Sequence, residues 1–170
     1  RNAVLLKLTA EGDFVWARHF DQAWHVDDLQ LAVRDDGSIY LGFIYGRRVD
    51  ADPGPGESIF SIPDSSNGMN SLIVHLDSNG DFLWARNHSS SSALRPLVID
   101  RSGGVIVAQR SGLLRRYSTA GTELWNRLLE GPSDIYVWDS IAGDDDDFYL
   151  LGVVNQQSVT IGTQHGDDSD

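Results

Sequence analysis

Short apolar runs alternate with short turn-forming segments along this chain. Residues 3–8 are apolar apart from one Lys, residues 9–13 are turn formers around Gly12, and residues 14–18 alternate in polarity and size. Alternation with a period of two indicates a β-strand, and a Gly in a short connection supplies the positive φ of a hairpin turn. These residues therefore predict a β-hairpin. No segment keeps an apolar period of about 3.6 residues over ten or more positions, so we expect almost no helix.

The same hairpin pattern occurs three times. Residues 71–86 align with residues 3–18 without a gap and share seven of sixteen positions, and residues 112–127 form a third copy. We expect the Trp of each copy to pack between neighbouring sheets, and the Arg to cover its Trp or to pair with a carboxylate of the next sheet. The recurring turn Gly and terminal Trp-x-Arg of the three copies are Gly12, Trp16, Arg18, Gly80, Trp84, Arg86, Gly121, Trp125 and Arg127.

A second hairpin follows each of the first ones. Residues 29–44 have the pattern strand, turn, strand, which returns at residues 97–107 and 140–154. In the last of these, Ala142, Asp146 and Gly152 align with Ala32, Asp36 and Gly42. Four strands per copy is the strand count of a propeller blade. The predicted fold class is all-β: a β-propeller fragment of about three four-stranded antiparallel blades, in one segment with repeats at approximately residues 1–70, 71–111 and 112–170.

Three blades form an incomplete ring, because propellers typically have about four to eight. The chain opens on Arg1 rather than Met and is already apolar by Val4, and residues 167–170 fall where a new blade would start. We therefore expect the remaining propeller blades of the same polypeptide to be partners of this segment on both sides.

The charge balance limits the classes of partner. Acidic side chains number 25 against 13 basic ones, and the net charge of −12 opposes binding to phosphate backbones and anionic membranes. We therefore predict no nucleic-acid partner. No apolar run approaches the roughly 20 residues of a membrane helix, so no membrane insertion is expected. The chain has no Cys, which excludes disulfides, thiol catalysis and thiolate metal sites.

Carboxylate-rich turns are the candidate metal sites. Asp50 and Asp52 lie beside two Pro-Gly pairs, and Asp144 and Asp146 belong to a run of four acidic residues whose repulsion a cation would relieve. These four are candidates for weak calcium binding, but we favour the simpler interpretation that they belong to solvated turns. Residues 77–81 also alternate oxygen-bearing side chains, but they lack the Gly and Glu spacing of a calcium loop and favour an ordinary hairpin turn.

No catalytic motif is present in the sequence. The five His residues show no metal-binding spacing, and neither a G-x-S-x-G nucleophile elbow nor a Gly-rich phosphate loop occurs. We assign no catalytic residue, and the cofactor-binding residues stay unknown. No cofactor is expected, and calcium is the one ion retained as a candidate.

Residues 71–86 resemble the repeat of the SBBP family, the seven-bladed β-propeller repeat of large bacterial secreted and surface proteins. Residues 32–42 are similar to that family's strand-turn-strand segment, and residues 49–56 to an insert of many of its members. In the third copy, residues 112–125 are also similar to the PQQ-type repeat of quinoprotein propellers. The SBBP resemblance implies a propeller and an exported location, either extracellular, at the cell surface or periplasmic.

These observations lead to the prediction of a non-enzymatic scaffold that presents blade-rim loops to a protein or glycan partner. The rim candidates are residues 47–56, within an arm inserted at residues 47–70, and residues 144–147, because repeats place variable inserts on a shared face. Two alternatives stay open. One is part of a quinoprotein (PQQ-type) dehydrogenase whose further blades complete a cofactor site, and the other is a scaffold in outer-membrane assembly.

Overall fold

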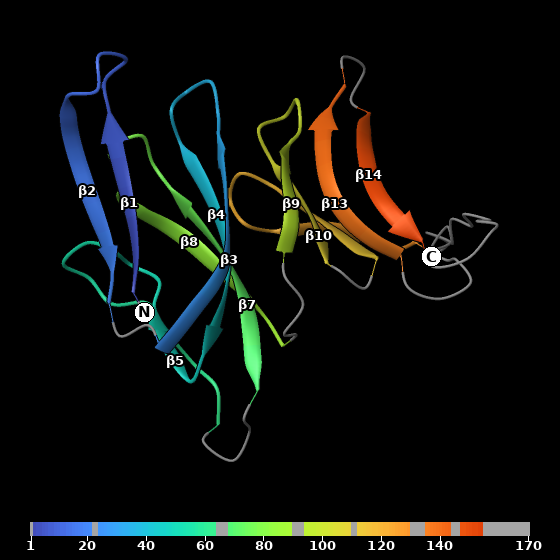
Figure 1. Ribbon diagram of the computed structural model, residues 1–170, viewed down its shortest axis with the longest axis horizontal. Coiled ribbons are helices and arrows are strands. Elements are labelled where there is room, and N and C mark those ends of the chain that lie inside the picture. Colours follow the sequence, from blue (N-terminus) through green and yellow to red (C-terminus); the bar gives the residue numbers. More distant parts are fainter. Residues whose placement is uncertain are drawn as a thin grey trace. The chain divides into compact units, whose positions relative to one another are not determined.

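The computed structural model describes residues 2–21, 24–63, 68–89, 94–109, 112–129, 135–143 and 147–154, which contain strands and turns but no helix. The all-β class predicted from the sequence is confirmed. The chain divides into two compact units, Arg1–Leu94 and Arg95–Asp170. The strands, drawn in Figure 1, are β1 (Ala3–Leu8), β2 (Phe14–Phe20), β3 (Trp24–Val33), β4 (Ile39–Gly46), β5 (Arg48–Asp50), β6 (Ile59–Ser61), β7 (Met69–Leu76), β8 (Phe82–His88), β9 (Leu94–Ile99), β10 (Val105–Gln109), β11 (Leu113–Tyr117), β12 (Glu123–Leu128), β13 (Ile135–Ala142) and β14 (Phe148–Val154).

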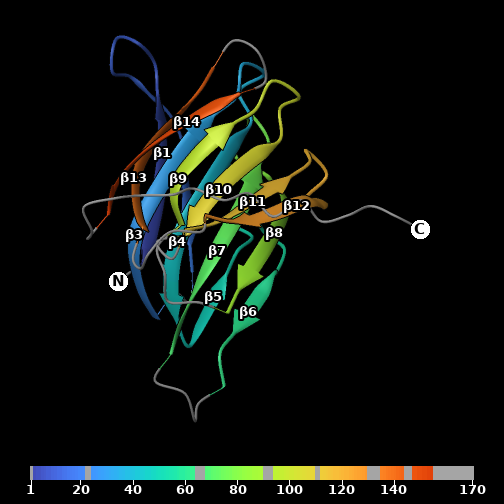
Figure 2. The same cartoon turned by 90° about the vertical axis from the view of Figure 1, so that its right-hand side faces the viewer.

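The first unit is built from one four-stranded sheet and two hairpins. The sheet has the antiparallel order β3-β4-β7-β8, and Figure 2 shows these four strands side by side. β1 and β2 form a separate hairpin. β5 and β6 form a short hairpin that interrupts the chain between β4 and β7.

The second unit contains the other four-stranded sheet, in which β9, β10, β11 and β12 follow one another in sequence order. β13 and β14 form a separate antiparallel hairpin. Both four-stranded sheets are therefore antiparallel meanders, and no sheet of the described strands closes on itself.

One turn geometry recurs in the hairpins. In the first, the N–H of Thr9 donates to the carbonyl of Asp13 (2.8 Å) and the N–H of Gly12 donates to the carbonyl of Thr9 (3.0 Å), with Gly12 at a φ of 92°. This is a β-turn followed by a left-handed residue, as in hairpins with a three-residue loop and a bulge. The same pair of bonds, with a Gly at positive φ, begins at Arg34, Asp77, Asp100 and Ser118.

The three Trp-ending hairpins share one pairing register. In each of them the register shifts directly after the Trp pair, next to the turn, which is the mark of a β-bulge. Equivalent side chains of the three hairpins therefore point to equivalent faces. The pairs are Trp16 with Lys7, Trp84 with His75, and Trp125 with Arg116.

The sheets do not coincide with the sequence copies. β4 and β7 pair along their full length, from Ile39 opposite Leu76 to Gly46 opposite Met69. One four-stranded sheet thus combines the second hairpin of copy one with the first hairpin of copy two, and the pairing of β10 with β11 joins copies two and three in the same way. The sheet boundaries lie between β2 and β3 and between β8 and β9. The start chosen for a sequence repeat is arbitrary, so a sheet can combine the end of one copy with the beginning of the next.

The last hairpin differs by one residue from its sequence alignment. Ala142 pairs with Phe148 directly beside the turn, as Val33 pairs with Ile39. Ala142 therefore takes the place of Val33, and its alignment with Ala32 is wrong by one residue. Because successive strand residues point to opposite faces, this shift exchanges the faces on which the side chains of β13 and β14 lie.

The main core of the first unit lies between the β1–β2 hairpin and one face of the four-stranded sheet. Phe20 of β2 contacts Phe43 of β4 edge to face, with 5.8 Å between ring centroids. Leu5 and Trp16 of the hairpin also pack against this core. We call this side of the sheet the receiving face; its buried side chains include Ile39, Leu41, Phe43, Leu72, Val74 and Leu76.

Leu76 and Leu8 occupy equivalent positions in the first two copies, but Leu76 is fully buried and Leu8 is 54% exposed. We expect Leu76→Ala to lower the free energy of unfolding by about 2–5 kcal/mol, because it leaves a cavity in the core. Leu8→Ala, the matched control, should lower it by less than about 0.5 kcal/mol. Urea unfolding followed by Trp fluorescence in dilute solution measures both, and equal effects would contradict the receiving face as the core.

Candidate functional site

The Trp and Arg that end the first hairpin hold the turn of the next one. Arg18 Nε donates to the carbonyl of Gly80 (3.0 Å), and its Nη2 donates to the carbonyl of Asn79 (2.7 Å) and to Asp81 Oδ1 (2.8 Å). The guanidinium also lies over the ring of Trp16, 5.4 Å from its centroid. One side chain of the β1–β2 hairpin thus satisfies two carbonyls and a carboxylate of the neighbouring sheet.

Gly80 lies at the centre of this contact. It has a φ of 79°, and a Cβ there would lie 2.9 Å from Cγ of Arg18 and 3.1 Å from the ring of Trp16. Gly12 has a comparable φ of 92°, but a Cβ there would meet nothing within 4 Å. Gly80 is therefore required both by the backbone conformation and by the close approach of the Trp and Arg side chains.

The second Trp and Arg belong to an aromatic cluster on the opposite face of the same sheet. The ring of His75 stacks on Tyr40 at 4.1 Å between centroids and lies 5.3 Å from Trp84. The guanidinium of Arg86 is 5.5 Å from the centroid of the Trp84 ring. Tyr40, His75 and Trp84 are all buried, so the recurring aromatic residue serves packing here.

The third Trp packs within the second unit. Its ring lies 6.4 Å from that of Phe148 of β14, at an interplanar angle of 20°. Ala108, Leu114 and Val137 form the buried cluster against which Trp125 and Phe148 pack. Arg127 Nη1 donates to the carbonyl of Asn126 (2.9 Å).

Asp77 closes its own hairpin turn. Its Oδ1 accepts hydrogen bonds from the N–H of Asn79 (2.8 Å) and of Asp81 (2.9 Å). The bond from the Asp81 amide is the main cause that lowers the pKa of Asp77. The carboxylate at the start of residues 77–81 is thus an acceptor for turn amides.

The two calcium candidates of the inserted arm also bind backbone amides. Asp50 is buried, and its Oδ1 accepts from the N–H of Asp52 (3.1 Å) and of Ser58 (2.9 Å). Asp52 Oδ1 accepts from the N–H of Gly54 (2.8 Å). Both carboxylates hold the turns of the arm. The base of the arm is anchored in the core by Val49, Ala51 and Ile62.

The other two calcium candidates, Asp144 and Asp146, lie outside the described residues. Within the described ranges, no group of three or more His, Asp or Glu side chains is placed to hold a metal ion. No helix in this part of the chain is long and apolar enough to cross a membrane.

Asp100 is an acid whose side chain is only 7% exposed, and the sequence pattern did not reveal its role. Its Oδ2 accepts from Arg116 Nε (2.7 Å), and its Oδ1 accepts from Ser102 Oγ (2.6 Å) and the N–H of Gly104 (3.0 Å). Burial raises the pKa of Asp100, but the hydrogen bonds from Ser102 and Arg116 outweigh it, so the pKa is lowered overall. The sequence feature that could have indicated this ion pair is an Asp at the first position of a hairpin turn, sixteen residues before Arg116.

Glu123 forms a second polar group in the same sheet. Its Oε2 accepts from Arg115 Nη1 (2.8 Å) and from the hydroxyl of Tyr117 (3.1 Å), and its Oε1 accepts from Asn126 Nδ2 (2.8 Å). Burial, and then the negative charge of Glu123, raises the pKa of the Tyr117 hydroxyl. The hydroxyl therefore remains a donor at neutral pH, and the group stabilises the hairpin of β11 and β12.

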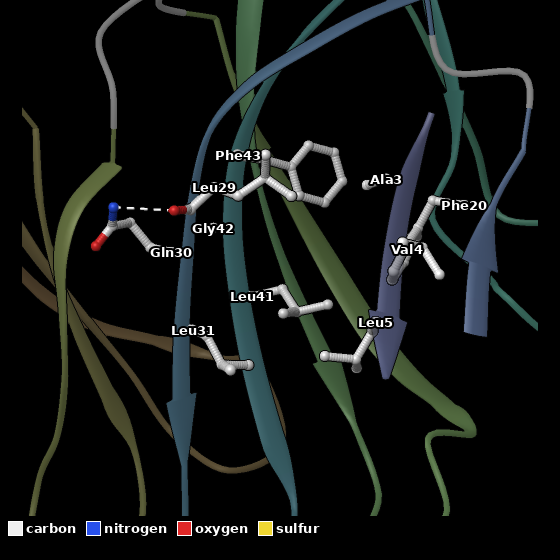
Figure 3. A pocket seen from close by; sticks show the side chains of 10 residues that line it. All are labelled: Ala3, Val4, Leu5, Phe20, Leu29, Gln30, Leu31, Leu41, Gly42 and Phe43. Atoms are coloured by element: carbon white, nitrogen blue, oxygen red, sulfur yellow. Dashed lines mark hydrogen bonds between the residues drawn. The ribbon is translucent and has the colours of Figure 1, made fainter. Parts of the chain in front are cut away.

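An apolar groove of about 160 Å³ opens between β1 and strands β3 and β4. Figure 3 shows Leu41 between Leu5 on one side and Leu31 on the other. Gln30 is the one polar side chain among the lining residues, and its amide donates to the carbonyl of Leu29 (3.0 Å). The groove is suited to apolar side chains rather than to a sugar or a charged cofactor, which need several polar partners.

No protein-family model matches the chain, and no curated protein is similar to it in sequence at a significant level.

We expect Gly80→Ala to lower the free energy of unfolding more than Gly12→Ala does. An L-residue at a left-handed φ costs about 1–2 kcal/mol, which is the whole effect at Gly12. At Gly80 the methyl group also displaces Arg18 or Trp16, and we expect a total loss of roughly 2–4 kcal/mol. Urea unfolding measures both variants. Similar losses would show that the Trp and Arg side chains do not depend on this turn.

Acid is expected to weaken the second sheet through Asp100. Since its pKa is lowered in the folded protein, the ionised form stabilises the fold above the unfolded pKa of about 3.9, and the contribution is lost as the pH falls through the lower folded value. We expect Asp100→Asn to destabilise the protein at neutral pH and to flatten the acid limb of the stability profile. Urea unfolding at several pH values tests this; the same acid slope in both proteins would rule it out.

Proposed function

We propose that the chain is a segment of a β-propeller that acts as an exported, non-enzymatic scaffold for a protein or glycan partner. The observation that carries the proposal is the contact of Trp16 and Arg18 with the Gly80 turn, because it uses recurring aromatic and cationic side chains to hold one sheet against the next. Two four-stranded antiparallel meanders, each with the strand count of a blade, support the same architecture. The resemblance of residues 71–86 to the SBBP repeat supports the exported location.

The inserted arm is the surface that we propose for the partner, with the 144–147 turn as a second rim candidate. Val49 and Ala51 are fully buried, and the carboxylate of Asp50 fixes the backbone at the base of the arm. The tip, residues 55–57, is exposed. A loop with a fixed base and an exposed tip can accommodate sequence change and contact a partner without loss of the scaffold.

The buried acids of the described residues support a scaffold over an enzyme. Asp50 accepts two backbone N–H groups, and Asp100 is paired with Arg116 and hydrogen-bonded to Ser102. A carboxylate whose oxygens accept several hydrogen bonds from the surrounding protein stabilises local structure, which favours a scaffold.

A photo-crosslinking residue at position 57 tests the arm. We expect a crosslinker in place of Glu57 to capture a protein or glycan from the secreted and surface fraction of the producing cells. A crosslinker in place of Glu11, an equally charged position in the exposed turn of the first hairpin, is the matched control. The same captured species in equal yield from both positions would count against the arm as the binding surface.

A glycan array with the purified chain separates the two partner classes. Specific binding to a glycan that disappears when residues 54–57 are replaced by Gly and Ser, but persists in Glu11→Ser, would identify the arm as a glycan site. Binding that survives the replacement would exclude the arm.

A further inference from the structure

We propose that Asn79 and Gly80 form a self-modification site, at which the Asn79 side chain cyclises onto the Gly80 nitrogen at a rate that the Arg18 contact controls. Asn79 is exposed, and the residue after it has no side chain that would hinder attack by its backbone nitrogen. In the corresponding turns of the other two Trp-ending hairpins, Glu11 and Ala120 stand in place of Asn79. Neither side chain can close the same five-membered ring, so of these three turns only the middle one carries the reaction.

The reaction consumes only water. The nitrogen of Gly80 forms a bond to the side-chain carbonyl carbon of Asn79, and the bond from that carbon to the side-chain nitrogen breaks. The proton of the Gly80 amide leaves with the side-chain nitrogen as ammonia. Water then opens the succinimide ring at either carbonyl, which yields aspartate or isoaspartate at position 79. In isoaspartate the main chain runs through the former side chain and is one carbon longer.

The folded turn holds the peptide group between Asn79 and Gly80 at both ends. Its carbonyl oxygen accepts from Arg18 Nη2 (2.7 Å), and its N–H donates to the carbonyl of Asp77 (3.0 Å). Cyclisation requires this peptide group to rotate, so that the Gly80 nitrogen approaches the side-chain carbon of Asn79. The rotation breaks both hydrogen bonds, and the folded turn therefore resists the reaction.

Further contacts from the β1–β2 hairpin restrict the same rotation. The next carbonyl, that of Gly80, accepts from Arg18 Nε (3.0 Å), so one guanidinium binds two consecutive carbonyls. Arg18 and the Trp16 ring also lie so close that a Cβ at Gly80 would be 2.9 and 3.1 Å from them. The neighbouring hairpin thus restrains the reactive turn from outside, and opening of this contact admits the reaction.

The turn at Gly12 provides an unrestrained counterpart. It has the same two backbone hydrogen bonds as the Gly80 turn, a Gly at a comparable positive φ, and the same Asp-Phe pair after the Gly. Glu11 is exposed, and a Cβ at Gly12 would meet nothing within 4 Å. In the purified chain of 170 residues, the two turns therefore differ mainly in the contact with Arg18 and Trp16.

The modification would release the contact that controls it. The added main-chain carbon lengthens the turn between the two carbonyls that Arg18 binds, and it moves Gly80 out of its close fit against Trp16. Loss of ammonia makes the change irreversible in water, so the packing of the first hairpin has a limited chemical lifetime. The site involves neither a partner nor a further blade, and this proposal can therefore fail or hold independently of the proposed function.

The Glu11→Asn variant compares the two turns within one molecule. We expect position 11 to convert about tenfold or more faster than position 79 in mildly alkaline native buffer, because hydrogen bonds to a charged donor add to the cost of opening the second turn. In concentrated urea the two positions should convert at equal rates, since both precede Gly-Asp-Phe. Peptide mapping by mass spectrometry follows each position, with Asn67→Ser in every protein to remove the other Asn-Gly pair. Equal rates in native buffer would overturn the proposal.

The Arg18→Gln variant tests the restraint itself. We expect conversion at Asn79 to be about tenfold faster than in the unmodified chain. Val49→Ala is the control for a general loss of stability, because Val49 is fully buried at the base of the arm and makes no part of the turn contact. The two variants are compared at equal free energy of unfolding, adjusted with low concentrations of urea. A rate in Arg18→Gln no higher than in Val49→Ala would overturn control by Arg18.

The released contact has its own measurement. Ion exchange separates the modified chain, which has gained a negative charge, and enzymatic methylation identifies its isoaspartyl form. We expect this form to unfold at a lower urea concentration than Asn79→Asp, which has the same charge but a main chain of normal length. Equal unfolding midpoints would show that the longer turn keeps Arg18 and Trp16 in place, and would overturn the release.

Discussion

A β-sheet with apolar side chains on both faces must be covered on both faces, and the rest of this structure depends on that requirement. All eight residues of β4 are buried, so this strand needs a packing partner on either side. The β1–β2 hairpin covers the receiving face with Phe20, Leu5 and Trp16. The arm between β4 and β7 adds its base to the same core. A single sheet of this kind is therefore not an independent folding unit, and its stability comes from contact with its neighbours along the chain.

Polar groups at the sheet ends are arranged to serve the same stacking. Each tight turn leaves carbonyls and amides that need partners. Asp77 satisfies two amides of its turn from within, while Arg18 satisfies two carbonyls of that turn from the neighbouring hairpin. The cation above Trp16 thus links sheet packing to turn hydrogen bonding. At this contact Gly80 permits the close approach, Trp16 supplies the apolar contact, and Arg18 supplies the polar contact.

The strands and hairpin turns could be predicted from the sequence, because alternation and turn Gly residues are local signals. The division into sheets could not, since the pairing of β4 with β7 joins residues from different sequence copies across an insertion of variable length. The faces of the last hairpin were also missed, because a one-residue error in alignment exchanges the two faces of a strand. Asp100 resembles other turn acids in sequence, and its pairing with Arg116 arises only when β10 and β11 come together.

The requirement for two covered faces also bears on the apolar residues that are exposed in the first hairpin. Leu72, Val74 and Leu76 are fully buried, whereas the equivalent Val4, Leu6 and Leu8 are more than half exposed. The two sets have the same residue character and the same register, so the difference lies in whether another layer packs above them. Neighbouring apolar side chains on one exposed sheet face form a surface that can pack against a further layer. The face of the β1–β2 hairpin that carries Val4, Leu6 and Leu8 therefore has the residue character of a covered sheet face, without a covering layer among the described residues.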